Sequence, residues 1–175
     1  MNKQEIINKL QANHQNFVGF ITNLSDADFT FSNNSKWTAG QQLDHICRGV
    51  KPLMQGFMLP KFVFGLLFGT AEKASLAYDD LVKKYQTILA DGGKASGRFI
   101  PKTIEISEKE KLKNNLLKSV ESLTKNLEKF SENDLDKYRL PHPLLGKLTV
   151  REMLYFTIYH VEHHHKAALK NLEVN

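Results

Sequence analysis

The chain has 175 residues, of which 41% are hydrophobic and 25% charged, a composition typical of a folded globular protein and not of a disordered one. It has a formal net charge of +5, but its lysines are spread along the sequence, so we expect no nucleic-acid partner. The single cysteine, Cys47, excludes an intramolecular disulfide and favours a reducing compartment.

The most apolar stretch, residues 53–68, is interrupted by Pro60, Lys61 and glycines and is too short for a dependable bilayer span. The first residues contain no apolar segment of the kind found in signal peptides. We therefore expect a cytoplasmic protein without a membrane segment. We interpret residues 53–68 as buried or interfacial.

The first part of the chain predicts two helices. Apolar residues recur at helical spacing from position 3 to 23. Thr38 and Gln41 have the spacing of a capping box, in which each side chain hydrogen-bonds to the backbone of the other, so a second helix should begin at Thr38. Pro52 should bend or end this helix, because proline lacks the N–H donor that a helix interior uses.

The segment 71–90 also has helical periodicity, and the glycine pair that follows, Gly92 and Gly93, should stop the helix. Ser107 and Glu110 form a second capping-box pattern, which predicts a helix from Ser107 to about residue 130.

A third capping box, formed by Thr149 and Glu152, predicts the last helix. Residues 139–148 contain two prolines and a glycine and read as a loop, and no convincing strand periodicity is present. The segment Ser25-Asp26-Ala27-Asp28-Phe29 after the first helix is echoed by Ser131-Glu132-Asn133-Asp134-Leu135.

Together these signals predict an all-α protein with a single domain over residues 1–175. The expected fold is a four-helix bundle with an extra helical segment in the crossover 51–105. A crossover of that length permits neighbouring helices to run parallel, so the helix order around the bundle stays open.

Four histidines fall between positions 160 and 165 of the last predicted helix. On a helical wheel of about 100° per residue, His164 lies inside the apolar stripe and His160 at its edge. His163 lies well outside it, and His165 lies on the opposite margin, where it could donate to a neighbouring helix. His160 and His164 are about 6 Å apart along the axis, so they can share one metal ion, and His45 from another helix can complete the site.

A purely structural interpretation of these histidines also stays open, since a single histidine on an apolar face is usually a hydrogen-bonded core residue. A buried pair without metal would repel itself on protonation, and a metal removes that problem. If the two helices ran parallel from level N-termini, His45 would lie about 6 Å from the height of His160. A stagger or an antiparallel arrangement would remove this offset.

Other candidates are weaker. Cys47 lies two residues after His45 and points elsewhere on a helix, so an inert thiol is the better interpretation. Trp37 is expected to be a core anchor. Residues 92–98 have the composition of an anion-binding loop, but they follow a helix instead of opening one, so a contact to a substrate phosphate or carboxylate is a minor alternative.

Three pieces of the sequence resemble the DinB/YfiT-like superfamily. They are Trp37-Thr38-Ala39-Gly40-Gln41-Gln42-Leu43-Asp44-His45-Ile46, Pro141-His142-Pro143-Leu144-Leu145-Gly146-Lys147-Leu148-Thr149-Val150-Arg151-Glu152-Met153-Leu154, and His160-Val161-Glu162-His163-His164. The resemblance implies a four-helix bundle with a divalent metal held by His45, His160 and His164, and often a homodimer. Some members are similar to thiol S-transferases that use bacillithiol or mycothiol, and others to metal-dependent hydrolases.

Three neutral imidazoles with open coordination positions describe a Lewis-acid site for zinc, nickel or iron. We expect a metalloenzyme that activates a low-molecular-weight thiol for transfer to an electrophilic small molecule. A hydrolase using the same metal is the first alternative. A non-catalytic bundle that binds a ligand or partner through residues 53–68 is the second.

Overall fold

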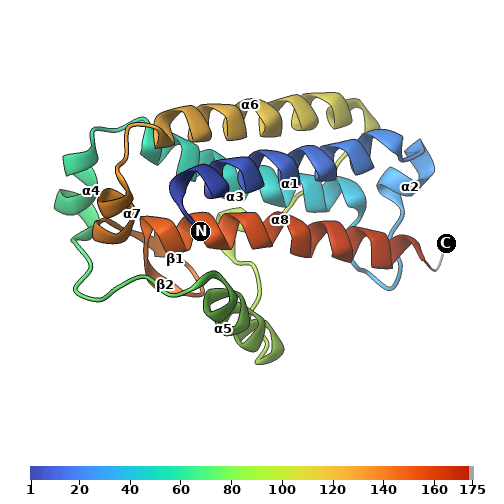
Figure 1. Cartoon of the computed structure of the whole chain (residues 1–175). Coiled ribbons are helices and arrows are strands. Elements are labelled where there is room, and N and C mark those ends of the chain that lie inside the picture. Colours follow the sequence, from blue (N-terminus) through green and yellow to red (C-terminus); the bar gives the residue numbers. More distant parts are fainter. Residues whose placement is uncertain (174–175) are drawn as a thin grey trace.

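A computed structural model describes residues 1–173, so the last two residues of the expected domain lie outside the described part. The protein is all-α apart from one small hairpin, as the sequence predicts. Four long helices form the bundle (Figure 1): α1 (Lys3–Asn23), α3 (Ala39–Phe57), α6 (Lys109–Leu127) and α8 (Val150–Leu172).

Each long helix packs against two others, so that α1 and α3 lie on opposite sides of the bundle with α6 and α8 between them. Helices α1 and α8 run parallel (Figure 1). Their N-terminal ends lie together, as the hydrogen bond from Arg151 at the start of α8 to the backbone carbonyl of Met1 shows. Helices α3 and α8 run antiparallel (Figure 1). Accordingly, Asn171 near the C-terminal end of α8 donates to the carbonyl of Phe31, in the segment that leads into α3. The antiparallel pairing removes the offset between His45 and His160.

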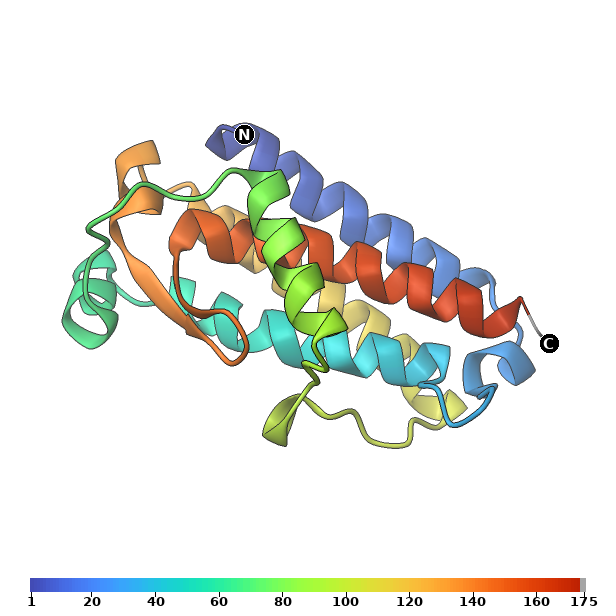
Figure 2. The ribbon, with the colours of Figure 1, turned by 90° about the horizontal axis from the view of Figure 1, so that it is seen from below.

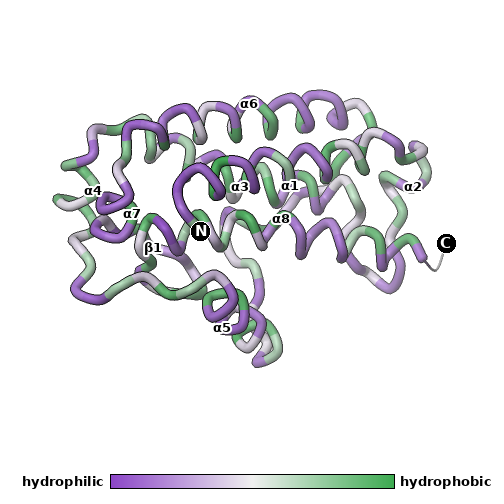
Figure 3. The backbone as a smooth tube through the Cα atoms, in the orientation of Figure 1, coloured by the Kyte–Doolittle hydropathy of each residue, from purple (hydrophilic) through white to green (hydrophobic). Residues whose placement is uncertain are grey.

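Hydrophobic and hydrophilic residues alternate along each long helix (Figure 3), and the hydrophobic ones fill the core. The capping boxes expected at Thr38 and Thr149 are both present. Helix α3 continues through Pro52 to Phe57, so Pro52 does not end the helix. The two echoed segments each form a short helix, α2 (Asp26–Thr30) and α7 (Glu132–Lys137), capped by Ser25 and Ser131.

The capping box predicted at Ser107 is wrong. Glu105 and Glu108 form the box instead, around the 3₁₀ turn η2 (Ile106–Glu108), and α6 begins at Lys109. Glu108 bonds to the backbone N–H of Glu105, so the chain makes one tighter turn before the α-helix.

The crossover between α3 and α6 contains two helices, α4 (Lys61–Phe68) and α5 (Tyr78–Ala90), followed by the 3₁₀ turn η1 (Gly97–Phe99). Helix α5 crosses the bundle steeply over α8 (Figure 2). It begins later than predicted, because Thr70 and Ala71 pair with the backbone at Tyr138 and Lys137 and remain extended. It ends at Ala90, before the glycine pair, as expected.

Residues 139–148 are not a loop, and this prediction was wrong. Strands β1 (Arg139–His142) and β2 (Gly146–Thr149) form an antiparallel hairpin in which Leu140 lies opposite Leu148. Both leucines are buried, and Gly146 takes the positive φ of 76° that the turn requires. Strands of four residues are too short to show a period-two pattern in the sequence.

The apolar run 53–68 divides between core and surface. Phe64 of α4 is 1% exposed, whereas Phe62 and Leu66 on the same helix are 67% and 79% exposed. Among residues 1–173, no helix is both long and apolar enough to cross a membrane. Homodimerisation through the exposed part of this run stays a prediction.

Helix α1 buries a histidine, His14, which is 1% exposed. The Nδ1–H of His14 donates to the carbonyl of Leu10 at 2.7 Å, and its Nε2 finds no hydrogen-bond partner among residues 1–173. Burial lowers the pKa of His14 to about 4. Its folded-state pKa therefore lies below the value of about 6.5 expected in the unfolded chain.

We expect His14→Leu to make the protein more resistant to acid. Between pH 6.5 and 4 the unfolded chain binds a proton at His14 that the folded protein does not, so stability falls as the pH drops through this window. Between pH 7 and pH 5, wild type should lose about 2 kcal/mol more unfolding free energy than the variant. Urea unfolding at both pH values measures the difference, and equal losses would contradict the buried, unprotonated state.

Candidate metal centre

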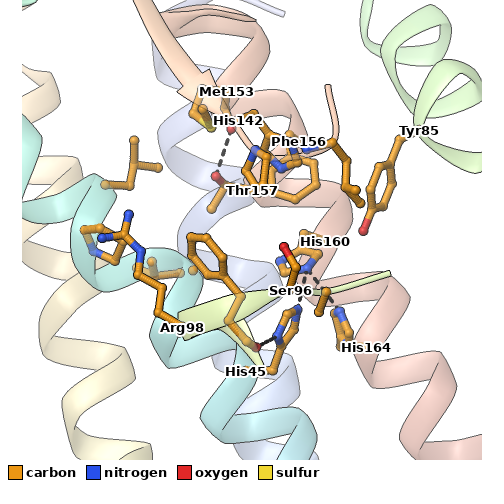
Figure 4. Close-up of a pocket in the computed structure, with 18 of the residues that line it drawn as sticks. His45, Tyr85, Ser96, Arg98, His142, Met153, Phe156, Thr157, His160 and His164 are labelled. Carbon is orange, nitrogen blue, oxygen red and sulfur yellow. Dashed lines mark hydrogen bonds between the residues drawn. The ribbon is translucent and has the colours of Figure 1, made fainter. Parts of the chain in front are cut away.

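The histidines that the sequence singles out meet in space. His45 projects from α3, His160 and His164 project from α8, and all three are buried (Figure 4). The Nε2 atom of His160 lies 3.1 Å from Nε2 of His45 and 3.0 Å from Nε2 of His164. The three candidate ligand atoms lie within 4.8 Å of one another, so they could hold one metal ion.

Hydrogen bonds at Nδ1 fix the tautomer and the ring orientation of two of these imidazoles. The Nδ1–H of His45 donates to the carbonyl of Phe99 at 2.6 Å, and the Nδ1–H of His164 donates to the side-chain oxygen of Gln42. Since both acceptors are oxygens that carry no proton, each neutral ring carries its proton on Nδ1. Both Nε2 atoms therefore present a lone pair toward the third histidine.

This arrangement fits a metal ion. An Nε2–H on His160 could donate to one of the two lone pairs, but not to both. Nitrogen ligands lie about 2.0–2.1 Å from zinc in tetrahedral sites, which places ligand nitrogens roughly 3.3 Å apart. The Nε2 atom of His160 lies close to this distance from the Nε2 atoms of His45 and His164, at 3.1 and 3.0 Å. Burial, reinforced by neighbouring imidazoles, holds the pKa of His160 and His164 well below the usual histidine value. The rings are therefore neutral, as ligands must be.

A glycine makes room for the cluster. Gly49 lies one helical turn after His45 on α3, and a Cβ atom placed there would lie 3.7 Å from Cε1 of His160. Gly49 therefore lets the imidazole of His160 pack directly against the backbone of α3.

Trp37 belongs to the site, not to the core, so its expected role as a core anchor was wrong. Its ring is only partly buried. The ring centroid lies 5.0 Å from that of His45 and 6.1 Å from that of His164. The segment just before the Thr38 cap therefore forms one wall of the histidine cluster.

Tyr85 of α5 was missed by sequence reasoning. Its ring centroid lies 6.4 Å from that of His160, and its hydroxyl points toward the cavity in Figure 4. No hydrogen-bond partner for this hydroxyl is found within residues 1–173. Burial raises the pKa of Tyr85 to about 12, so the group stays a neutral donor.

His142 of the hairpin also lines the cavity and was not singled out. Its Nδ1 accepts hydrogen bonds from the backbone N–H groups of Leu144 and Leu145, at 3.2 and 3.0 Å. The neutral ring therefore carries its proton on Nε2. Burial lowers the pKa of His142 to about 4, which makes it a hydrogen-bond donor at neutral pH.

The remaining candidates lie outside the cluster. His163 lines the cavity beside His164, with ring centroids 5.1 Å apart. His165 packs on Phe20 of α1 at 4.6 Å and makes no hydrogen bond with the described residues, in contrast to the donor role expected for it. Burial raises the pKa of the Cys47 thiol to about 12, which agrees with an inert thiol.

The three histidines line a cavity of about 890 Å³, a size typical of small-molecule sites. It is enclosed by helices α3, α4, α5 and α8, the hairpin and the segments 35–37 and 93–100. The loop with the composition of an anion-binding loop therefore does form a wall. Among the described residues that line the cavity, the lysines and arginines are Lys36, Lys94 and Arg98. None of the described residues that line it is an aspartate or glutamate.

A comparison with curated proteins finds no match. A comparison with protein-family models matches residues 9–168 to the DinB superfamily. The match spans nearly the whole chain and includes every element that surrounds the histidine cluster. The chain therefore belongs to the DinB superfamily.

Proposed function

We propose that the protein is a metal-dependent enzyme that transfers a low-molecular-weight thiol to an electrophilic small molecule. The observation that carries the proposal is the convergence of three Nε2 atoms, two of them fixed as lone-pair donors, at the wall of a ligand-sized cavity. The metal ligands would be His45, His160 and His164, and the metal would be zinc, nickel or iron.

In the proposed reaction a thiol RSH and an electrophile R′X give the thioether RSR′, the anion X⁻ and a proton. The S–C bond forms, the C–X bond breaks with its electron pair going to X, and the thiol proton leaves to solvent. A divalent metal at the histidines would supply Lewis acidity that lowers the pKa of the thiol. The hydroxyl of Tyr85 and the Nε2–H of His142 are donors that would stabilise the negative charge developing on the leaving group.

A feature of the cavity favours a thiol over water as the nucleophile. A thiol has an ordinary pKa of about 8.5, far below the value of about 15.7 for water. Its pKa therefore has to be lowered much less before it becomes the nucleophilic anion. Metal-dependent proteases place a carboxylate beside the metal as general base. The described lining of this cavity includes no carboxylate. The two carboxylates that lie beside the histidines in sequence, Asp44 and Glu162, are not among the lining residues.

The test compares electrophile consumption with and without thiol. With protein loaded separately with zinc, nickel or iron, adding a low-molecular-weight thiol should raise the rate at least tenfold above the uncatalysed thiol reaction. His164→Ala should abolish the enhancement, and His163→Ala should keep most of it. A rate that is independent of thiol would identify a hydrolase. If no metal-loaded form enhances the rate, the protein is a non-catalytic binding protein.

A further inference from the structure

The cavity extends well beyond the histidines. Gly56 lines its far end and lies eleven residues after His45 on α3, which is about 16 Å along the helix axis. The walls there are apolar, formed by the end of α3, by α4, by the hairpin and by the start of α8. We call this end the apolar arm, lined by Leu53, Val63, Phe64, Phe68, Leu140 and Met153.

The polarity of the cavity is ordered along its length. The polar groups gather at the histidine end, where Lys36 precedes Trp37 and where the Phe99 carbonyl binds His45. The side chain of Arg98, a second cation of the lining, points away from the histidines (Figure 4). Neither these two cations nor Lys94 forms an ion pair within residues 1–173. A small polar substrate would use only this end and would leave the apolar arm filled with poorly bonded water.

We propose that the electrophilic substrate is an amphiphile, with an apolar chain in the apolar arm and an anionic head, such as a carboxylate, at the histidine end. Its reactive carbon would lie next to the head. The inference rests on the proposed function for the reaction at the histidines. Binding of the chain, however, depends on the apolar walls alone and can be measured in metal-free protein.

Straight-chain carboxylates from butanoate to decanoate are the probes, and the fluorescence of Trp37, the only tryptophan, reports their binding. Each methylene buried in the apolar arm should tighten binding roughly fourfold. Decyltrimethylammonium carries the same chain on a cationic head and should bind roughly tenfold more weakly than decanoate. Equal affinity for butanoate and decanoate would overturn the proposal, as would equal affinity for the two decyl compounds.

Two pairs of variants locate the chain and the head. A Cβ atom at Gly56 would meet nothing within 4 Å, so Gly56→Leu should fill part of the apolar arm and weaken decanoate at least tenfold while leaving butanoate unchanged. Gly19→Leu is the matched control on α1, outside the cavity. Lys36→Gln with Lys94→Gln should weaken both carboxylates, and the same change at Lys83 and Lys84, which do not line the cavity, should not.

Quenching of Trp37 fluorescence by bromine shows which end of the bound carboxylate lies next to the histidines. Trp37 lies at the histidine end, so 2-bromodecanoate should quench its fluorescence more strongly than 10-bromodecanoate. The reverse order would place the chain at the histidines and overturn the proposal.

The outcome is separable from that of the metal reaction. If His164→Ala abolishes thiol transfer but keeps the chain-length dependence, both proposals hold. A chain-length dependence in a protein without thiol transfer refutes the reaction alone. Unchanged decanoate affinity in Gly56→Leu refutes the amphiphile alone.

Discussion

Replacing His164 with alanine is expected to lower the affinity for a divalent metal by several orders of magnitude. The substitution removes one of three imidazoles whose Nε2 atoms converge, and only two nitrogen ligands remain. The same change at His160 or His45 should have an effect of the same order, because each supplies one ligand. Metal titration of protein prepared without nickel resin, followed by elemental analysis, measures the loss.

His163→Ala is the matched control. His163 adjoins His164 in sequence and lines the same cavity, but it is not one of the three converging histidines. Its removal should reduce affinity by no more than about 10–100-fold, the effect of disturbing a residue next to a ligand. Loss of metal from His163→Ala together with retention by His164→Ala would show that the helical-wheel assignment is wrong. If the metal content is unchanged in all four variants, these histidines are structural core residues and not metal ligands.

Replacing Phe64 with alanine is expected to destabilise the protein by about 3–5 kcal/mol, the usual penalty for emptying a buried phenylalanine site. The Phe64 ring is 1% exposed and packs edge-on against Phe57 and Phe130, with centroids 5.7 and 5.6 Å away. These contacts attach α4 to the bundle. Urea denaturation followed by circular dichroism measures the change in unfolding free energy.

Phe62→Ala offers a control of the same residue type on the same helix. Phe62 is 67% exposed, so its removal should change the unfolding free energy by no more than about 0.5 kcal/mol. Similar losses in the two variants would contradict the burial difference along α4. A large loss in Phe62→Ala alone would indicate that the exposed face of α4 is covered in solution, as the predicted homodimer requires.

The parts of the fold that the sequence predicted are those determined by local interactions. A capping box such as that of Thr38 and Gln41 is completed within four residues, so the sequence contains all of it. The hairpin and the late start of α5 depend on partners far along the chain, such as the bond from Ala71 to Lys137. Local patterns cannot reveal these partners, which is why both were missed.

The same distinction holds at the site. The spacing of His160 and His164 on one helix face was visible in the sequence, because a helix converts spacing into direction. The roles of Tyr85 and His142 were not, because no local pattern shows that α5 crosses α8 or that the hairpin reaches the cavity. The helical periodicity of 71–90 puts Tyr85 on the apolar face of its helix, but that pattern does not distinguish a site residue from a core residue.

The histidine cluster joins two helices, α3 and α8, that lie far apart in the sequence and pack antiparallel. His45 and His160 are separated by 115 positions, so a partly folded chain in which α8 has not docked offers only His45 from one side or the α8 pair from the other. An ion held by all three would act as a reversible cross-link that rewards only the complete helix pairing. Metal would then shift the balance from partly folded forms toward the native one, and resistance to proteolysis would rise with metal concentration.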